Sequence, residues 1–192
     1  MPDLLDHYPL TAGTYHELLD DSGGVRPHWR RLIDQLQRST PSQLVQRQAL
    51  LTRQIQENGV TYNVYADPKG ADRPWELDLL PHVIAADEWA QLSAGIAQRA
   101  RLLNAVLADL YGPQRLIAEG LLPAELVFGH NNFLWPCQGI TPPDGAFLHL
   151  YAVDLARTPD GRWWVTADRT QAPSGAGYAL ENRTIVSRAF PE

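Results

Sequence analysis

The sequence predicts an α+β fold, in which N-terminal helices and a long amphipathic helix pack with a sheet that contains a β-hairpin. Apolar residues recur at spacings of three and four between residues 87 and 110, the pattern of one buried helix face. Two runs rich in β-branched and aromatic residues flank Pro159-Asp160-Gly161, which is a turn sequence. With 44% hydrophobic and 20% charged residues, the composition is that of a globular protein.

Two helices are expected before the first strand. The pattern predicts one over residues 27–38, which begins at a proline and carries an apolar face. The next helix runs to about Glu57, where Asn58-Gly59 supplies a left-handed cap. Residues 60–65 then alternate in the manner of a strand.

The most regular helix is expected over residues 87–110. Asp87 is a suitable N-cap, and Tyr111-Gly112-Pro113 ends the helix with a glycine and a helix-blocking proline. This helix contributes to a core, and we assign it no chemistry. Its polar side is expected to face solvent and carries Gln98, Arg99 and Arg101. A short helix and a loop-rich stretch follow up to residue 145.

A β-hairpin is expected between residues 150 and 170. Proline presets the first turn residue and glycine accepts the left-handed position, which predicts a three-residue loop with a glycine bulge. That loop pairs Thr158 with Arg162. Counting outward from this pair puts Ala152 opposite Asp168 and Asp154 opposite Thr166.

In this register the two acidic residues of the hairpin, Asp154 and Asp168, share one face as diagonal neighbours, because side chains alternate with period two. Such neighbours lie roughly 7–8 Å apart, within reach of a shared cation or phosphate. A two-residue loop would place them on opposite faces. Alternatively, both are solvated charges on the outer face of an edge hairpin.

A glycine-containing loop, Ser174-Gly175-Ala176-Gly177, follows the hairpin. It lacks the ending of a Walker phosphate loop, and it is no dinucleotide fingerprint because Leu180 holds the third glycine position and no clear helix follows. We expect backbone amides of this loop to approach an anion or a substrate carboxylate, since glycine permits close approach. An ordinary surface turn is the alternative.

These residues resemble a known family. Asp154, the Pro-Asp-Gly hairpin, Asp168 and Pro173-Ser174-Gly175 are similar to the metal-binding end of ATP-grasp ligases. A closer resemblance, to the circularly permuted ATP-grasp type 2 family, is carried by Glu88-Trp89, Gln98-Arg99, the segment from Asp109 to Gly112 and, most specifically, the run from Ala167 to Arg183. The likeness covers roughly residues 55–192. It implies a helical N-terminal extension of residues 1–57 and the N-terminal part of a circularly permuted ATP-grasp domain over residues 58–192.

The resemblance also implies roles for individual residues. Asp154 and Asp168 are similar to the family's magnesium ligands, and Thr170 stands where ordinary ATP-grasp enzymes have an asparagine ligand. Two carboxylates suffice in number, because Mg²⁺ uses one or two together with nucleotide phosphates. The catalytic group implied is Ser174, Gly175 and Arg169. The residues implied to bind the cofactor ATP are Gly177, Glu181, Asn182 and Arg183. For Glu181, Asn182 and Arg183, contact with the substrate, support of the site from behind and an ordinary salt-bridging cluster stay open as alternatives.

The function implied is that of an ATP-dependent ligase, which joins a small-molecule or peptide carboxylate to an amine through an acyl-phosphate. Permutation would place the nucleotide-gripping elements beyond Glu192, so we expect this chain to be the N-terminal part of a longer enzyme. A surface left exposed in this way could support homo-oligomers. Two alternatives stay open: a non-catalytic ligand- or protein-binding module of the same ancestry, and a structural α+β interaction domain that uses Trp163 and Trp164.

Composition excludes several other classes. A net charge of −6 argues against nucleic acid as a partner, because phosphate-backbone binding requires a basic patch. The single cysteine, Cys137, allows no internal disulfide and fits a reducing compartment. The sequence has neither a run of 18 apolar residues nor a basic, apolar N-terminus, which argues against a membrane span and a signal peptide. We therefore expect a cytoplasmic protein.

Overall fold

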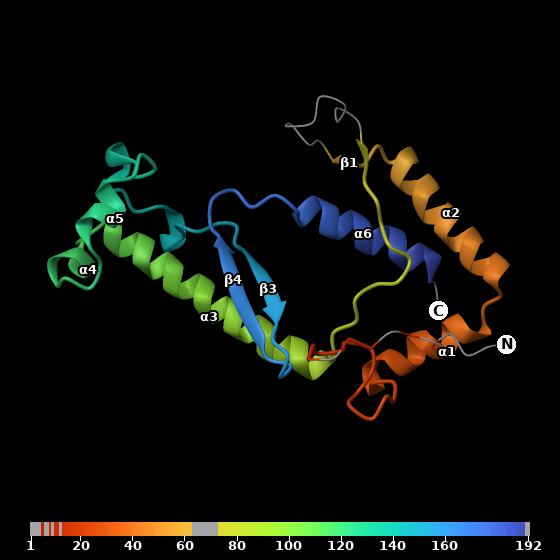
Figure 1. The fold of residues 1–192 in the computed structure, drawn as a ribbon. Coiled ribbons are helices and arrows are strands. Elements are labelled where there is room, and N and C mark those ends of the chain that lie inside the picture. Colours follow the sequence, from red (N-terminus) through yellow and green to blue (C-terminus); the bar gives the residue numbers. More distant parts are fainter. Residues whose placement is uncertain (1–4, 6–7, 9, 12, 63–72, 191–192) are drawn as a thin grey trace. The chain divides into compact units, whose positions relative to one another are not determined.

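The fold was analysed in a computed structural model, which describes residues 5, 8, 10, 11, 13–62 and 73–190 (Figure 1). The chain divides into two compact units. The first unit comprises residues 1–85, 158–161 and 174–192, and the second comprises residues 86–157 and 162–173.

The first unit is mainly helical. Its elements are a 3₁₀-helix η1 (Pro27–Trp29), helices α1 (Arg30–Arg38), α2 (Pro41–Glu57) and α6 (Ala176–Ala189), and the short strands β1 (Thr61–Tyr62) and β2 (Arg73–Pro74). A capping box between Thr40 and Gln43 starts α2, because each side chain bonds the backbone N–H of the other residue. Gly59 ends it in the left-handed conformation, with φ at +63°. The two helices expected before residue 58 are therefore confirmed.

Two apolar clusters hold the first unit together. In one, Ile33 and Leu36 of α1 pack with Leu18 and Leu19. In the other, Leu51 and Ile55 of α2 meet α6 at a fully buried Ile185 and at Ala189, which is 4% exposed. Burial of these side chains is the main stabilising contribution in this unit, since each removes apolar surface from water.

The second unit is built on α3 (Ala86–Leu110) and a hairpin of β3 (Ala152–Arg157) and β4 (Trp163–Arg169) (Figure 1). Its short helices are α4 (Arg115–Ala118), α5 (Ala124–Phe128), η2 (Trp135–Cys137) and η3 (Pro143–Gly145). Asn104 of α3 accepts hydrogen bonds from the backbone N–H groups of Phe147 and Leu148 at 2.9 and 3.0 Å, and donates one to the carbonyl of Gly145. One side-chain amide thus fixes the approach to the hairpin against the long helix.

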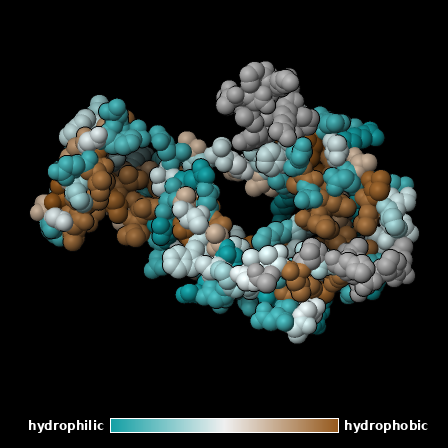
Figure 2. Space-filling view, viewed as in Figure 1, coloured by the Kyte–Doolittle hydropathy of each residue, from teal (hydrophilic) through white to brown (hydrophobic). Residues whose placement is uncertain are grey.

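A cluster of aromatic rings lies near the C-terminal end of α3. The Tyr111 and Phe133 rings stack with centroids 4.8 Å apart, and the Phe128 and Trp135 rings stack at 5.0 Å. Several large apolar side chains of this region are exposed, and Figure 2 shows hydrophobic atoms gathered over α4 and α5. The exposed apolar side chains of this part of the chain include Leu121, Leu126, Leu134, Trp135 and Ile140.

The α+β class is confirmed, with three differences from expectation. Helix α3 begins at Ala86, so Asp87 lies in its first turn and is not the N-cap that was expected. Helix α6 begins directly after Gly175, so the expectation that no helix follows the glycine loop is wrong. Of the strand expected over residues 60–65, the described part is Thr61–Tyr62, and residues 63–72 lie outside the described residues. Among the helices that the structure describes, none has the length and apolar character needed to cross a membrane.

Truncation of Leu51 to alanine tests the packing of α2 against α6. Because Leu51 is fully buried, Leu51→Ala should lower the free energy of unfolding by about 2–5 kcal/mol, measured by urea denaturation. Val45→Ala on the same helix is the control: Val45 is 69% exposed, so its loss should change that free energy by less than about 0.5 kcal/mol. Equal effects of the two substitutions would contradict this packing.

Candidate functional site

The hairpin follows the expected register near its turn. A hydrogen bond of 2.8 Å from the Gly161 N–H to the Thr158 carbonyl closes the turn, and Gly161 has φ at +83°. Arg157 pairs with Trp163, and the pairing continues to Leu155 opposite Val165, as the glycine-bulge turn predicts.

Beyond Leu155 the register shifts by one residue. Asp154 lies opposite Ala167, and Val153 lies opposite Asp168, so Thr166 is an extra residue in β4. The Thr166 hydroxyl donates a hydrogen bond of 3.1 Å to the Asp154 carbonyl. This is a β-bulge, which changes the face to which every following residue of its strand belongs.

The bulge corrects the predicted position of the two carboxylates. Cross-strand partners share a face, so Asp154 lies on the side of Ala167 whereas Asp168 lies on the side of Val153. The predicted pairs, Ala152 with Asp168 and Asp154 with Thr166, are therefore wrong, and so is the shared face. The turn is as expected; the cause of the error is the extra residue farther along β4.

Asp168 lies on the hairpin face that is fastened to α3. Arg99 of α3 donates two hydrogen bonds of 2.6 Å to the two carboxylate oxygens, and the Tyr151 hydroxyl donates a third. These donors, Arg99 first, lower the pKa of Asp168 to about 2. Burial and the neighbouring Asp168 raise the pKa of Tyr151 to about 12, so the phenol stays protonated as a donor at neutral pH.

A second ion pair fastens the same face at another point along α3. Arg157 donates to Glu88 through both terminal nitrogens, at 2.6 and 3.0 Å, and its side chain is 7% exposed. Its guanidinium also stacks over the Trp163 ring, with Cζ 4.0 Å from the centroid. A charge so deeply buried requires such a partner, because burying it unpaired is costly.

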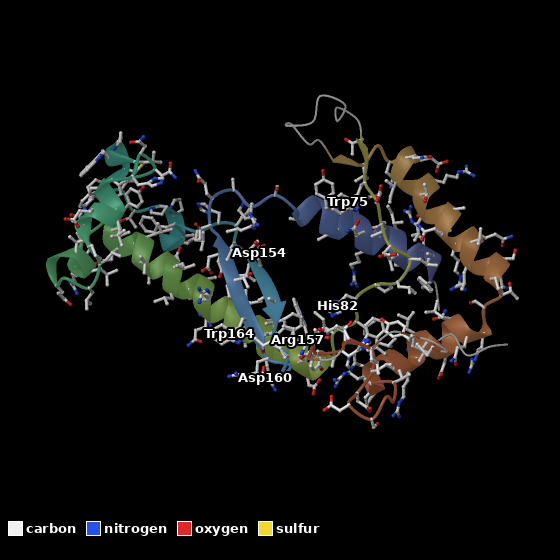
Figure 3. All side chains as sticks on the ribbon, viewed as in Figure 1. Trp75, His82, Asp154, Arg157, Asp160 and Trp164 are labelled. Atoms are coloured by element: carbon white, nitrogen blue, oxygen red, sulfur yellow. The ribbon has the colours of Figure 1, made fainter. Side chains whose placement is uncertain are left out.

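Asp154 lies on the opposite face of the hairpin and forms an ion pair with a different arginine, Arg169. Arg169 donates to it through Nε and Nη2, the shortest contact being 2.6 Å, and this lowers the pKa of Asp154. The Asp154 and Arg169 side chains are 42% and 60% exposed, so the pair adds little stability. Asp154, Arg157 and Trp164 all project from this hairpin (Figure 3).

The arrangement does not fit a shared Mg²⁺ ion. The two carboxylates lie on different faces, and each is engaged by an arginine that would repel a cation. Thr170 follows β4 as an exposed residue. Within the residues that the structure describes, no group of three or more histidine, cysteine or acidic side chains could hold a metal ion.

The remaining candidate residues belong to the first unit, around the start of α6. Gly175 has φ at +132°, which L side chains rarely adopt, and Ser174 is exposed. The first helical bond runs from the Ala179 N–H to the Gly175 carbonyl at 2.8 Å, so the N–H groups before Ala179 precede the helical ladder. Such N–H groups are suited to an oxyanion.

Two of the other candidates connect α6 to residues near the end of α2 and just after β2. The Asn182 side-chain oxygen accepts a hydrogen bond of 3.0 Å from the Trp75 indole, and Glu181 accepts one from Asn58. Gly177 and Arg183 are exposed on the helix.

Sequence reasoning missed Arg99 and Tyr151. Arg99 was expected on a solvated helix face; its side chain is 45% exposed, yet it binds Asp168. Its partner is 69 residues away along the chain, and no local pattern announces such a pair. The signal available in the sequence was an arginine on the polar side of a helix, Arg99, together with an acidic residue in a hairpin, Asp168.

The chain belongs to the circularly permuted ATP-grasp type 2 family, whose model matches residues 81–192. This match takes in α3, the hairpin and α6. An uncharacterised protein of Mycobacterium tuberculosis is 42% identical over 186 residues, and one of Synechocystis sp. is 38% identical over 178 residues. Each alignment covers 93% of this chain, but 21% and 37% of the respective relatives. The chain thus spans well under half the length of these relatives.

Acid should weaken the anchoring of the hairpin. Because the pKa of Asp168 is lowered from 3.8 to about 2, its ion pair stabilises the folded state above pH 4 and is lost as the pH falls toward 2. Asp168→Asn should therefore lower the free energy of unfolding by about 1–3 kcal/mol at pH 7, and the difference from wild type should shrink between pH 4 and pH 2.

Urea midpoints measured across that pH range check this prediction. The control is Asp21→Asn, which removes an exposed carboxylate that makes no ion pair with the residues that the structure describes. A difference between Asp168→Asn and wild type that persists unchanged at pH 2 would show that the carboxylate charge is not what anchors the hairpin.

Proposed function

We propose that this chain forms part of an ATP-dependent carboxylate–amine ligase. The observation that carries the proposal is the family match over residues 81–192, which includes the hairpin and the run from Ala167 to Arg183. In the proposed reaction a substrate carboxylate attacks the γ-phosphorus of ATP, giving an acyl-phosphate and ADP. An amine then attacks the acyl carbon, and phosphate leaves as the new C–N bond forms.

For this chain, the proposed contribution is to hold the carboxylate substrate at the start of α6. Backbone N–H groups after Gly175 would donate hydrogen bonds to its oxygens, and fixed donors of this kind stabilise charge without reorganisation. The φ of +132° at Gly175 supports this assignment, because any other residue there would strain the backbone that presents these N–H groups. Ser174 and Arg169 remain catalytic candidates on the same proposal, and Gly177 and Arg183 remain candidates for the nucleotide.

ATP and Mg²⁺ are the cofactors proposed for the whole protein, as for ATP-grasp chemistry in general. When bound, the metal neutralises phosphate charge during transfer. The assignment of its ligands to Asp154, Asp168 and Thr170 stays a prediction from sequence. The ion pairs of both carboxylates disagree with it. The proposed substrates are a small-molecule or peptide carboxylate and an amine. The proposed location is the cytoplasm.

One observation favours a second candidate, a non-catalytic binding module of the same ancestry. The two carboxylates expected to hold the metal each form an ion pair with an arginine, and they lie on opposite faces of the hairpin. A module that had lost phosphoryl transfer could retain such pairs because they stabilise the fold.

Nucleotide-dependent stabilisation separates the two candidates. A complete family protein that contains this segment, such as the Mycobacterium tuberculosis relative, should melt several degrees higher with Mg²⁺ and ATP than with Mg²⁺ and AMP, because ligand binding stabilises the native state. The 192-residue chain alone should show a smaller shift. Equal melting temperatures of the complete protein with ATP and with AMP would count against a ligase and favour the binding module.

Substitution of Gly175 tests the role given to the start of α6. Gly175→Val in the complete protein should lower ATP-dependent turnover at least about tenfold, because valine cannot adopt φ near +132° without strain. Gly95→Ala is the matched control, since Gly95 lies within α3 and a β-carbon there meets no atom within 4 Å. Phosphate release reports turnover, and the urea midpoint reports folding. Normal turnover in the Gly175→Val protein would refute this role.

A further inference from the structure

A cleft of the first unit lies between the polar sides of α1 and α2, and none of the residues that line it belongs to the candidate ligase site. Its volume is about 710 Å³. Helix α1 lines it along one side, where residues four apart share a face. The residues that line the cleft are Pro27, Arg30, Arg31, Asp34, Gln35, Arg38, Ser39, Gln43 and Arg47.

This cleft is strongly basic in a chain that is acidic overall. Four arginines line it against a single acidic residue, Asp34, whereas the whole chain carries a net charge of −6. The first turn of α2 contains no acidic residue, so the positive end of its helix dipole adds to the same field. Concentrated positive charge in a concave site attracts anions more strongly than the same charges spread over a surface.

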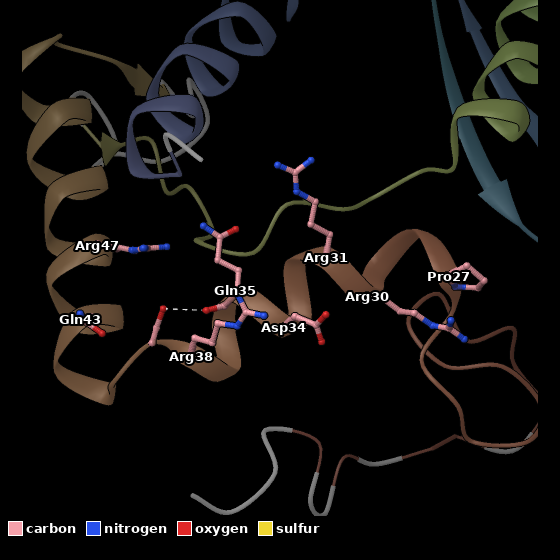
Figure 4. Close-up of a pocket in the computed structure, with 9 residues that line it drawn as sticks. Pro27, Arg30, Arg31, Asp34, Gln35, Arg38, Gln43 and Arg47 are labelled. Carbon is pink, nitrogen blue, oxygen red and sulfur yellow. Dashed lines mark hydrogen bonds between the residues drawn. The ribbon is translucent and has the colours of Figure 1, made fainter.

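Two of the lining side chains, those of Arg47 and Gln35, are half-buried. Arg47 stacks over the Phe190 ring, with Cζ 4.9 Å from the centroid, which holds its guanidinium on the α2 side. Gln35 reaches toward it from α1, and its buried amide nitrogen has no hydrogen-bond partner among the described residues (Figure 4). A buried donor of this kind is stabilised when an acceptor oxygen enters.

We propose that this cleft binds a multiply charged phosphate compound, a polyphosphate or the phosphate chain of a nucleotide. Planar guanidinium groups bind phosphate oxygens in pairs, and Arg30, Arg38 and Arg47 offer such groups along the cleft. The excess of positive over negative lining charges matches a tri- or diphosphate better than a single carboxylate. The site shares no residue with the proposed ligase chemistry, so the two proposals stand or fall separately.

Calorimetric titration of the 192-residue chain with inorganic tripolyphosphate, without magnesium and at low ionic strength, tests the site. Wild type should bind one equivalent. Arg38→Gln/Arg47→Gln should bind at least about tenfold more weakly, because two of four phosphate partners are lost. The double control Arg53→Gln/Arg101→Gln removes the same charge outside the cleft, and its affinity should stay within about twofold of wild type.

Because Arg47 also packs on Phe190, Arg30→Gln/Arg38→Gln serves as a second variant at two exposed positions and should weaken binding as well. Titration with ATP and with adenosine identifies the ligand source. ATP and tripolyphosphate binding equally supports a phosphate-chain site, and ATP binding more tightly supports a nucleotide site. Binding of neither, binding of adenosine alone, or equal loss of affinity in the control overturns the proposal.

Discussion

The ion pair between Arg99 and Asp168, with Tyr151 as a third donor, fixes the hairpin to the long helix. Glu88 and Arg157 form a matching pair of reversed polarity. On α3 the two anchors are eleven residues apart, which is three turns and about 16 Å. Four to five residues separate them along the hairpin, about 13–17 Å. Because the two spans agree, both ion pairs can form at once. Helix α3 supplies the arginine of one pair and the glutamate of the other, so turning the hairpin end to end would bring like charges together. The hairpin therefore lies along α3 in one orientation.

This anchoring decides what each acidic side chain of the hairpin can do. With Asp168 committed to α3, the bulge at Thr166 leaves Asp154 on the other face, where it pairs with Arg169. The hairpin therefore acts in this structure as a rigid support. The chemistry proposed for the chain rests instead on the backbone at the start of α6, and the basic cleft between α1 and α2 is a separate feature.

Local signals in the sequence were sufficient for the helices and for the turn. The C-terminal cap of α2 at Asn58-Gly59, the apolar period of α3 and Pro159-Asp160-Gly161 each act over a few residues, and all were predicted. The capping box that starts α2 was not predicted. No residue pattern near Thr166 marks the bulge, and the contact that engages Asp168 comes from a helix 69 residues away along the chain. Helix α6 was missed since glycines open it and dilute its apolar pattern. The family resemblance pointed to the run from Ala167 to Arg183, but it did not reveal which side chains these residues contact.

The central claim is that Asp168 acts with Arg99 and independently of Asp154. Double-mutant cycles on the free energy of unfolding test it most directly. Arg99→Gln with Asp168→Asn should show a coupling energy of about 0.5–3 kcal/mol, whereas Asp154→Asn with Asp168→Asn should be additive within about 0.5 kcal/mol, with or without Mg²⁺. Strong coupling between the two aspartates, above all coupling that appears when Mg²⁺ is added, would contradict the account and restore a shared metal site.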